Sequence, residues 1–203
     1  MTTPPAFVSE AGGVVREFRC GHHGAMSHEL TAGRKPPLIV VMGVSGTGKT
    51  TIGSVLARRL GVAFVDADSL HPRANIDKMA GGEPLNDDDR MPWLSIVGKR
   101  LGEAEVTSEG MVMACSALKR AYRASILAEA PRAFFLHLSG SEETLARRLE
   151  GRHEHFMPPA LLRSQLETLE GLHRDEPGAT VEVAGTVDHI VAECESVIER
   201  GTP

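Results

Sequence analysis

An apolar run that leads directly into a glycine-rich loop is the feature that most restricts the fold of this 203-residue chain. The run is Leu38-Ile39-Val40-Val41-Met42, and the loop Gly43-Val44-Ser45-Gly46-Thr47-Gly48-Lys49-Thr50 matches the pattern G-x-x-x-x-G-K-[ST]. An uninterrupted apolar run is typical of a buried strand in a parallel sheet. Glycines after such a strand let backbone N–H groups turn toward phosphate oxygens at the N-terminus of the next helix. The pattern therefore predicts a site for a nucleoside triphosphate.

The polar side chains of this loop have separate expected roles. Lys49 is expected to reach the β- and γ-phosphates, and the Thr50 hydroxyl is expected to ligate Mg²⁺. The predicted nucleotide-binding residues are Gly43, Ser45, Gly46, Thr47, Gly48, Lys49, Thr50 and Thr51. The motif leaves the phosphoryl acceptor open, because water, a protein switch and a small molecule all remain compatible with it.

Composition favours one globular α/β domain preceded by an extension. Hydrophobic residues make up 41% of the chain, which is enough for a substantial core. Proline and glycine interrupt any periodic pattern before Pro37, so we expect a flexible N-terminal extension over 1–36 and a single domain over 37–203. The net charge of -5 gives no general attraction to nucleic acid or an acidic membrane. Three scattered cysteines and the lack of a long apolar stretch favour a cytoplasmic protein.

From Leu38 onward, apolar runs alternate with amphipathic stretches, which predicts a parallel sheet with helices on both faces. The five expected strands are 38–42, 63–66, 111–115, 133–138 and 180–183. The expected helices are 49–60, 73–80, 93–103, 118–129, 141–150, 159–169 and 187–200. Ligands of such sheets bind beyond the carboxyl ends of the strands. We therefore expect the chemistry to follow Met42, Asp66, Cys115 and Leu138.

Two carboxylates leave the second expected strand at alternate positions. Asp66 and Asp68 lie where the glycine-rich loop would present a γ-phosphate. One of them is a candidate to hold Mg²⁺, and the other is a candidate to orient or deprotonate an attacking hydroxyl. The alternative is that Asp68 or Ser69 caps the next helix.

The following segment, 71–94, is strongly polar and contains the single tryptophan of the chain. A polyhydroxylated ligand needs paired donors and acceptors, and a ligand carboxylate is best bound by a forked guanidinium. Candidate substrate contacts in this segment are His71, Arg73, Asn86 and Arg90. The neighbouring run Asp87-Asp88-Asp89 is better explained as the cap of a helix at Trp93.

Several strings of residues together resemble the gluconokinase family of the small bacterial and eukaryotic type. They are the phosphate loop, Asp66-Ala67-Asp68-Ser69-Leu70-His71-Pro72, Asn75-Ile76-Asp77-Lys78-Met79, the stretch from Gly82 to Leu94, Cys115 to Arg123, His155-Phe156-Met157 and Gln165-Leu166-Glu167-Thr168-Leu169-Glu170. Their order and spacing are specific, although each string alone is weak. The resemblance covers nearly everything from Pro37 to the C-terminus, whereas the extension departs from the family pattern.

The resemblance implies a P-loop NTPase fold, a three-layer α/β/α sandwich with a five-stranded parallel sheet and a helical lid, shared with shikimate and nucleoside monophosphate kinases. It also implies transfer of the γ-phosphoryl group of ATP to the 6-hydroxyl of D-gluconate, and a homodimer. Asp68 would act on the hydroxyl and Asp66 with Thr50 on Mg²⁺, although these two aspartates are interchangeable at this stage. Arg148 would lie against adenine, and Arg152 in a lid around 150–160 would reach the transferring phosphate.

Three further candidates follow the third expected strand. Ser116 is either a substrate contact or the cap of the helix expected at Leu118. Lys119 and Arg123, one helical turn apart, would present a cationic face to the carboxylate of the substrate, with solvated charge as the alternative. Two other classes of protein remain for comparison. A GTP-dependent switch would need an N-K-x-D signature and a D-x-x-G signature directly after an expected strand, and we find neither in those places. Another small-molecule kinase would lack the 71–93 segment.

Overall fold

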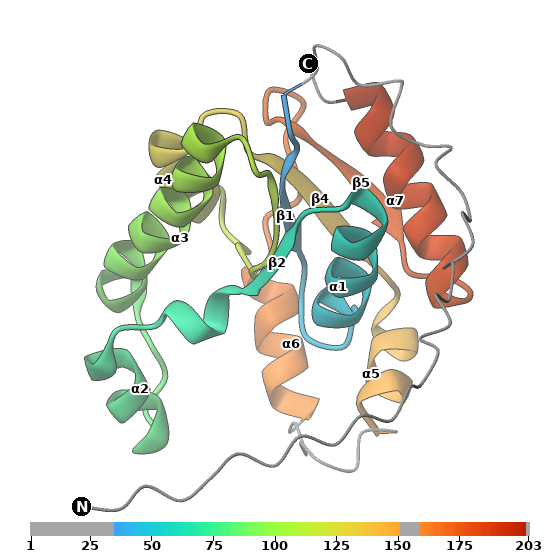
Figure 1. Ribbon diagram of the computed structural model, residues 1–203. Helices are drawn as coiled ribbons and strands as arrows, with labels where there is room; N and C mark the ends of the chain where they lie inside the picture. Colours follow the sequence, from blue (N-terminus) through green and yellow to red (C-terminus); the bar gives the residue numbers. More distant parts are fainter. Residues whose placement is uncertain (1–34, 151–158, 202–203) are drawn as a thin grey trace, which may run out of the picture. The chain divides into compact units, whose positions relative to one another are not determined.

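Five parallel strands form the centre of the molecule (Figure 1). The structure is a computed structural model that describes residues 35–150 and 159–201. Most of the expected extension and of the expected lid, including Arg152, therefore lies outside the described residues. None of the helices in the described ranges is long and apolar enough to cross a membrane.

The strands lie in the order β2-β3-β1-β4-β5, and every neighbouring pair is parallel. Their bounds are β1 Leu38–Met42, β2 Ala63–Asp66, β3 Met111–Ala114, β4 Phe134–Ser139 and β5 Gly178–Glu182. The expected five-stranded parallel sheet is confirmed, with shifts of one or two residues at the ends of three strands. Because all strands run the same way, their carboxyl ends share one edge of the sheet.

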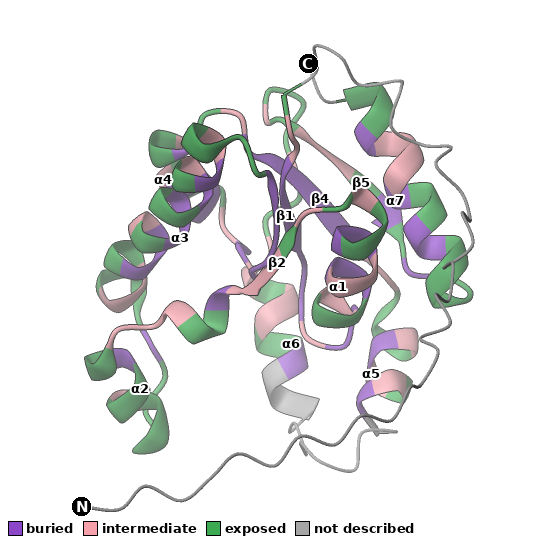
Figure 2. Ribbon diagram, viewed as in Figure 1, coloured by how far each residue is buried: buried purple, intermediate pink, exposed green. Residues whose placement is uncertain are grey.

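Helices cover both faces of this sheet, which gives the expected three layers. The helices are α1 Lys49–Leu60, α2 Arg73–Ala80, α3 Asp87–Thr107, α4 Arg120–Glu129, α5 Glu142–Glu150, α6 Pro159–Thr168 and α7 Val187–Gly201. Alternate residues of β1 enter different cores: Ile39 and Val41 pack with residues of α1 and α7, whereas Val40 and Met42 pack with residues of α3 and α4. Figure 2 shows β1 and β4 buried at the centre.

The turn from β1 into α1 requires glycine at specific positions. Gly43 has a φ of 138°, and a Cβ atom there would lie 2.6 Å from the Leu138 carbonyl oxygen. Gly48, with a φ of 89°, is the N-cap residue of α1. Positive φ angles are accessible to glycine at no steric cost. The glycines of the motif are therefore needed by the backbone itself, in addition to any ligand.

Helix α3 begins six residues before the expected start at Trp93, because its first turn has a complete capping box. Asn86 accepts a hydrogen bond from the Asp89 backbone N–H at 2.9 Å, and the Asp89 carboxylate accepts one from the Asn86 N–H at 2.9 Å. This reciprocal pair satisfies two amide groups that the helix cannot satisfy. Pro92 lies inside the helix rather than before it. The expected start at Trp93 was therefore wrong, and the Asp run forms the first turn of the helix rather than a cap before it.

The most buried charge of the described chain is Arg123, whose side chain is 0% exposed. Its guanidinium forms a bidentate pair with Glu176, at 2.6 Å from Nε and 2.9 Å from Nη2. The remaining N–H groups donate to the backbone carbonyls of Ala117, Leu118, Glu170 and Gly171. The prediction that Arg123 presents its charge to a substrate carboxylate is therefore wrong. The helical spacing from Lys119 is correct, but Arg123 lies on the face of α4 that points inward.

We expect Glu176→Gln to lower the free energy of unfolding by about 3 kcal/mol, because it leaves the buried Arg123 charge without its ionic partner. The hydrogen bonds from Arg123 hold the pKa of Glu176 below its ordinary value. The stabilisation is therefore complete above the ordinary carboxyl pKa of about 4.3 and is lost as the pH falls through the lowered value. Urea denaturation at pH 7 and near pH 3.5 measures both effects. The difference in the free energy of unfolding between the unsubstituted protein and Glu176→Gln should be smaller at the lower pH.

The matched control is Glu143→Gln, which removes an exposed carboxylate from Arg147 on α5. Because an exposed pair contributes little, this change should alter stability by less than about 1 kcal/mol. Equal losses in the two variants would contradict the structural role of the Arg123–Glu176 pair.

Candidate active site

The phosphate loop lies between β1 and α1, and its side chains brace the loop from within. The Thr47 hydroxyl, which is buried, donates to the Val44 carbonyl at 2.8 Å. The Lys49 ammonium donates to the same carbonyl at 3.2 Å, so the lysine side chain folds back over the loop. This geometry keeps a positive charge beside the backbone amides that would receive phosphate oxygens.

A cavity of about 230 Å³ opens beside this loop, and we call it the loop cavity. Arg148 of α5 forms part of its wall and donates to the Val183 carbonyl at 2.7 Å. The complete lining is Gly46, Thr47, Gly48, Thr51, Ile52, Arg148, Gly185, Val187 and Ile190. The structure thus brings Arg148 to the loop residues expected to bind the nucleotide.

The carboxylate at the end of β2 connects to the phosphate loop. The Thr50 hydroxyl donates to Asp66 Oδ2 at 3.0 Å, and Asp66 Oδ1 accepts the backbone N–H of Asp68 at 3.1 Å. The second bond caps the single 3-10 turn of Ala67–Leu70. Neither Asp68 nor Ser69 caps α2, whose N-cap residue is Pro72. The cap expected at this point is therefore supplied by Asp66, and the Asp68 side chain remains available for another role.

The electrostatic environment of Asp68 comes from both halves of the site. Partial desolvation, followed by the Asp66 carboxylate, raises the pKa of Asp68 above its ordinary value. The charges of His71, Lys49 and Arg90 act in the opposite direction. A carboxylate with a raised pKa is a stronger base than an ordinary one. The net effect of these groups is to raise the basicity of Asp68.

The His71 side chain is held by contacts with neighbouring residues. Its ring stacks on Trp93 with the centroids 4.0 Å apart, and the Trp93 indole N–H donates to the Ala67 carbonyl at 2.9 Å. The buried Asn75 lies 3.3 Å from His71 Nδ1 and donates to the Asp89 carbonyl at 2.9 Å. Desolvation lowers the pKa of His71, which favours the neutral ring. These contacts fix the 3-10 turn that carries Asp68 against α3.

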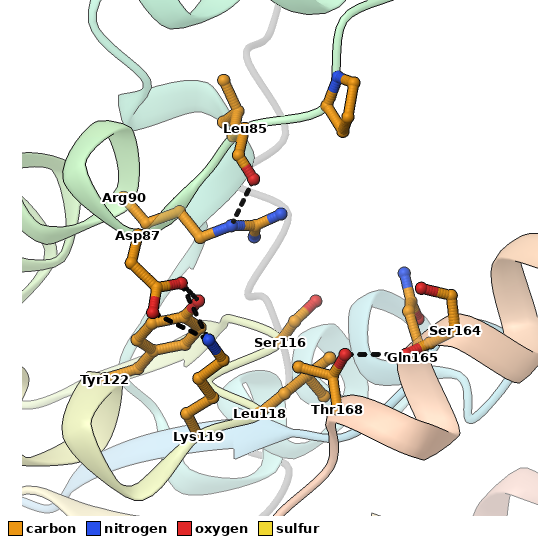
Figure 3. A pocket seen from close by; sticks show the side chains of 11 residues that line it. Leu85, Asp87, Arg90, Ser116, Leu118, Lys119, Tyr122, Ser164, Gln165 and Thr168 are labelled. Carbon is orange, nitrogen blue, oxygen red and sulfur yellow. Dashed lines mark hydrogen bonds and ion pairs between the residues drawn. The ribbon is translucent and has the colours of Figure 1, made fainter.

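A second cavity, of about 290 Å³, has a strongly polar lining, and we call it the polar cavity. It is lined by Pro84, Leu85, Asp87, Arg90, Ser116, Leu118, Lys119, Tyr122, Ser164, Gln165 and Thr168. Figure 3 shows Arg90, Asp87, Tyr122 and Lys119 on one side, and the α6 side chains on the other. The Arg90 Nε–H donates to the Leu85 carbonyl at 3.3 Å, and its terminal nitrogens point into the cavity (Figure 3).

The Asp87 carboxylate, at the wall of the polar cavity, accepts hydrogen bonds from two side chains. Lys119 Nζ lies 2.9 and 2.7 Å from its two oxygens, and the Tyr122 hydroxyl donates to Oδ1 at 2.5 Å. The hydrogen bond from Lys119, followed by that from Tyr122, lowers the pKa of Asp87, and the same contact raises the pKa of Lys119. Lys119 therefore faces the cavity as half of an ion pair rather than as an isolated cation.

The predicted substrate contacts divide into two groups. Arg90, Ser116 and Lys119 line the polar cavity, and Ser116 is not a helix cap, because α4 begins at Arg120 after Lys119. Asp68, His71, Arg73 and Asn86 are not among the residues that line it. The Arg73 side chain is 85% exposed and pairs with Asp77 along α2. The Asn86 side chain is occupied in the capping box of α3.

Sequence reasoning did not select several polar residues that line the polar cavity: Asp87, Tyr122, Ser164, Gln165 and Thr168. Asp87 was treated as a helix cap, and Tyr122 and Gln165 were not given a role. Tyr122 is the single tyrosine of the chain, which is a weak signal because a buried tyrosine usually has a partner for its hydroxyl. Gln165 belongs to a string that supported the family resemblance, but nothing in its local sequence relates it to the phosphate loop.

Comparisons with known proteins agree with this geometry. The AAA domain family matches residues 38–172. Gluconokinase of Gluconobacter oxydans is 50% identical over an alignment that covers 74% of this chain and 84% of the relative. The thermoresistant gluconokinase of Escherichia coli is 40% identical, with coverage of 81% and 94%.

The same relationship holds for three-dimensional structure. The crystal structure of a gluconokinase from Sinorhizobium meliloti superposes with a TM-score of 0.75 and 45% sequence identity, covering 84% of this chain and 95% of that one. The fold class expected from the sequence is therefore confirmed, and so is the resemblance stated from the motifs. On this combination of motifs, geometry and similarity, the chain belongs to the gluconokinase family of P-loop kinases.

Proposed function

We propose that this protein transfers the γ-phosphoryl group of ATP to the 6-hydroxyl of D-gluconate and so produces 6-phospho-D-gluconate, which feeds the pentose phosphate pathway. The observation that carries the proposal is the link between the phosphate loop and the end of β2, where the Thr50 hydroxyl donates to Asp66 and Asp66 accepts the backbone N–H of Asp68. This link holds Asp68 close to the loop residues that are expected to bind the nucleotide. The similarity to the gluconokinases described above supports D-gluconate as the acceptor.

The polar cavity suits a linear sugar acid. D-gluconate carries one carboxylate and several hydroxyl groups, so it needs a cation at one end and mixed donors and acceptors along its length. Arg90 offers a guanidinium fork for the carboxylate. Ser116, Thr168 and the Asp87–Tyr122 pair offer hydroxyl and carboxylate groups for the polyol. The cavity volume of about 290 Å³ is of the size that a small ligand needs.

Asp68 is the proposed base for the acceptor hydroxyl. Phosphoryl transfer depends on positioning and charge neutralisation more than on covalent chemistry, so one oriented carboxylate beside Lys49 is sufficient. Asp66 is the less suitable base, since its two oxygens already accept hydrogen bonds from Thr50 and from the Asp68 N–H. This contact pattern favours Asp68 for the hydroxyl and Asp66 for the metal.

The pair formed by Thr50 and Asp66 fits Mg²⁺. Both side chains offer hard oxygen atoms, which lie 3.0 Å apart at the mouth of the phosphate loop. Protein sites for Mg²⁺ use one or two such ligands and complete the shell with phosphate oxygens and water. When bound, the ion would neutralise charge on the phosphates.

Other features of the proposed enzyme extend the same scheme. Arg148, which lines the loop cavity, is proposed to lie against adenine, and Arg152 is proposed to reach the transferring phosphate from a lid around 150–160. A homodimer and a cytoplasmic location stay predictions from the sequence. Nucleic acid and membranes are not among the proposed partners.

We expect Asp68→Asn to lower kcat by a factor of about 10²–10⁴, because the amide cannot accept the hydroxyl proton. The affinity for ATP should change by less than about threefold, since Lys49 and the loop amides are untouched. A coupled assay of ADP release gives kcat, and isothermal titration calorimetry gives the affinity. Asp88→Asn, in the exposed first turn of α3, serves as the control and should behave as the unsubstituted enzyme. Near-normal turnover in Asp68→Asn would remove Asp68 from the reaction.

We expect Arg90→Met to raise KM for gluconate by about 10- to 100-fold, because one charge-assisted, forked contact with the carboxylate is lost. Arg90→Lys should recover only part of the loss, since an ammonium group cannot form two parallel hydrogen bonds. KM for ATP should move far less in both variants.

The control for this change is Arg100→Met, which removes an arginine from the exposed part of the same helix. Steady-state kinetics with gluconate, shikimate and nucleoside monophosphates as acceptors complete the experiment. Turnover with another acceptor but none with gluconate would overturn the proposed substrate. An unchanged KM for gluconate in Arg90→Met would overturn the role of Arg90 alone.

A further inference from the structure

One side chain connects the two cavities. Gln165 of α6 lines the polar cavity, and its Oε1 accepts a hydrogen bond from the backbone N–H of Ser45 at 2.7 Å. Ser45 lies in the middle of the phosphate loop, 120 residues away in the sequence. Because a backbone N–H can only donate, this contact fixes the orientation of the carboxamide, with its oxygen toward the loop.

Ser45 lies directly before the loop residues that line the loop cavity. The residues that follow it, Gly46 to Gly48, line the loop cavity, whereas Gln165 lines the polar cavity. The Ser45 N–H therefore contacts a residue of the polar cavity and directly precedes residues of the loop cavity, and we call this place the boundary between the two cavities. A group that passes from a nucleotide in the loop cavity to an acceptor in the polar cavity must cross this boundary.

In this contact the Gln165 oxygen takes the place that a phosphate oxygen would take on an amide of the loop. Amides of a phosphate loop are arranged to receive phosphate oxygens, and here a carboxamide oxygen occupies one of them. Within the described part of the chain, the Gln165 Nε2 group has no hydrogen-bond partner. Gln165 is half-buried, so it retains a donor at the same boundary while its acceptor is in use.

We infer that Gln165 is a positioning residue that contacts the terminal phosphoryl group of bound ATP and directs it toward the polar cavity. Its Nε2–H group would donate to an oxygen of the terminal phosphate, while Oε1 remains near the Ser45 N–H. The inference rests on the proposed function for the identity of the acceptor. The contrasting role is purely structural, in which Gln165 only ties α6 to the loop and never meets a phosphate.

The variant Gln165→Glu separates these two roles. A carboxylate has nearly the same shape and still accepts the Ser45 N–H, so a purely structural contact would persist. Beside a terminal phosphate, however, the added negative charge repels ATP and cannot donate a hydrogen bond. We expect the affinity for ATP to fall by about tenfold or more, and the affinity for ADP, which lacks that phosphate, to change by less than about twofold.

Calorimetry with ATP and with ADP, each in the presence of Mg²⁺ and without acceptor, measures the ratio of the two nucleotide affinities directly. The control is Ser164→Asp, which adds the same charge at the preceding residue of α6, on the wall of the polar cavity. This variant should leave the ratio of the ATP and ADP affinities unchanged. An equal loss for both nucleotides in Gln165→Glu, or no loss for either, would overturn the inference.

A second variant tests positioning in turnover. Gln165→Leu keeps the approximate size of the side chain but removes both polar atoms, and we expect kcat to fall by about tenfold or more with KM for gluconate within about threefold. Normal kcat in Gln165→Leu would overturn the inference even if binding behaved as expected. Lack of gluconate turnover in the unsubstituted protein would instead reject the proposed substrate, and the comparison of ATP with ADP would still decide the role of Gln165.

Discussion

The acceptor side of the molecule depends on the buried pair of Arg123 and Glu176. Taking a guanidinium out of water is costly, and the cost is offset only when every N–H finds an acceptor. Here the six contacts of Arg123 come from the loop before α4 and from the segment between α6 and β5. Both segments adjoin residues that line the polar cavity, Ser116 and Lys119 in the first segment and Thr168 beside the second. The ion pair therefore ties together two parts of the cavity lining.

The strand order explains why the chemical groups meet. Strand β1 is central, with β3 beside it and β2 beyond, so the phosphate loop, Ser116 and Asp66 follow three consecutive strands. The Gly43 N–H donates to the Ser116 carbonyl, and the Thr50 hydroxyl donates to Asp66. These two bonds connect the three strand ends directly. The donor and acceptor sites are thus built from one edge of one sheet, and neither needs a separate domain.

Local signals allowed most of the fold to be predicted, whereas side-chain direction was the main source of error. Apolar runs and the glycine-rich loop gave the strands and α1, because burial and backbone conformation act over a few residues. The start of α3 was misplaced, since the Asp run was taken as a cap before Trp93, whereas the capping box of Asn86 and Asp89 begins the helix at Asp87. Arg123 was misassigned because helical spacing relates it to Lys119 but does not say which face is buried. Gln165 was not selected, since its contact with Ser45 spans 120 residues.

The charges around Asp68 link acceptor binding to proton transfer. Desolvation and Asp66 raise the pKa of Asp68, while His71, Lys49 and Arg90 lower it, so its ionisation is a balance of opposing effects. Arg90 acts in that balance and also faces the polar cavity. A bound carboxylate would offset part of the Arg90 charge and so raise the pKa of Asp68 further, which makes it a stronger base when the acceptor is present. Removal of Arg90 would therefore change the pH dependence of turnover as well as the affinity for the acceptor.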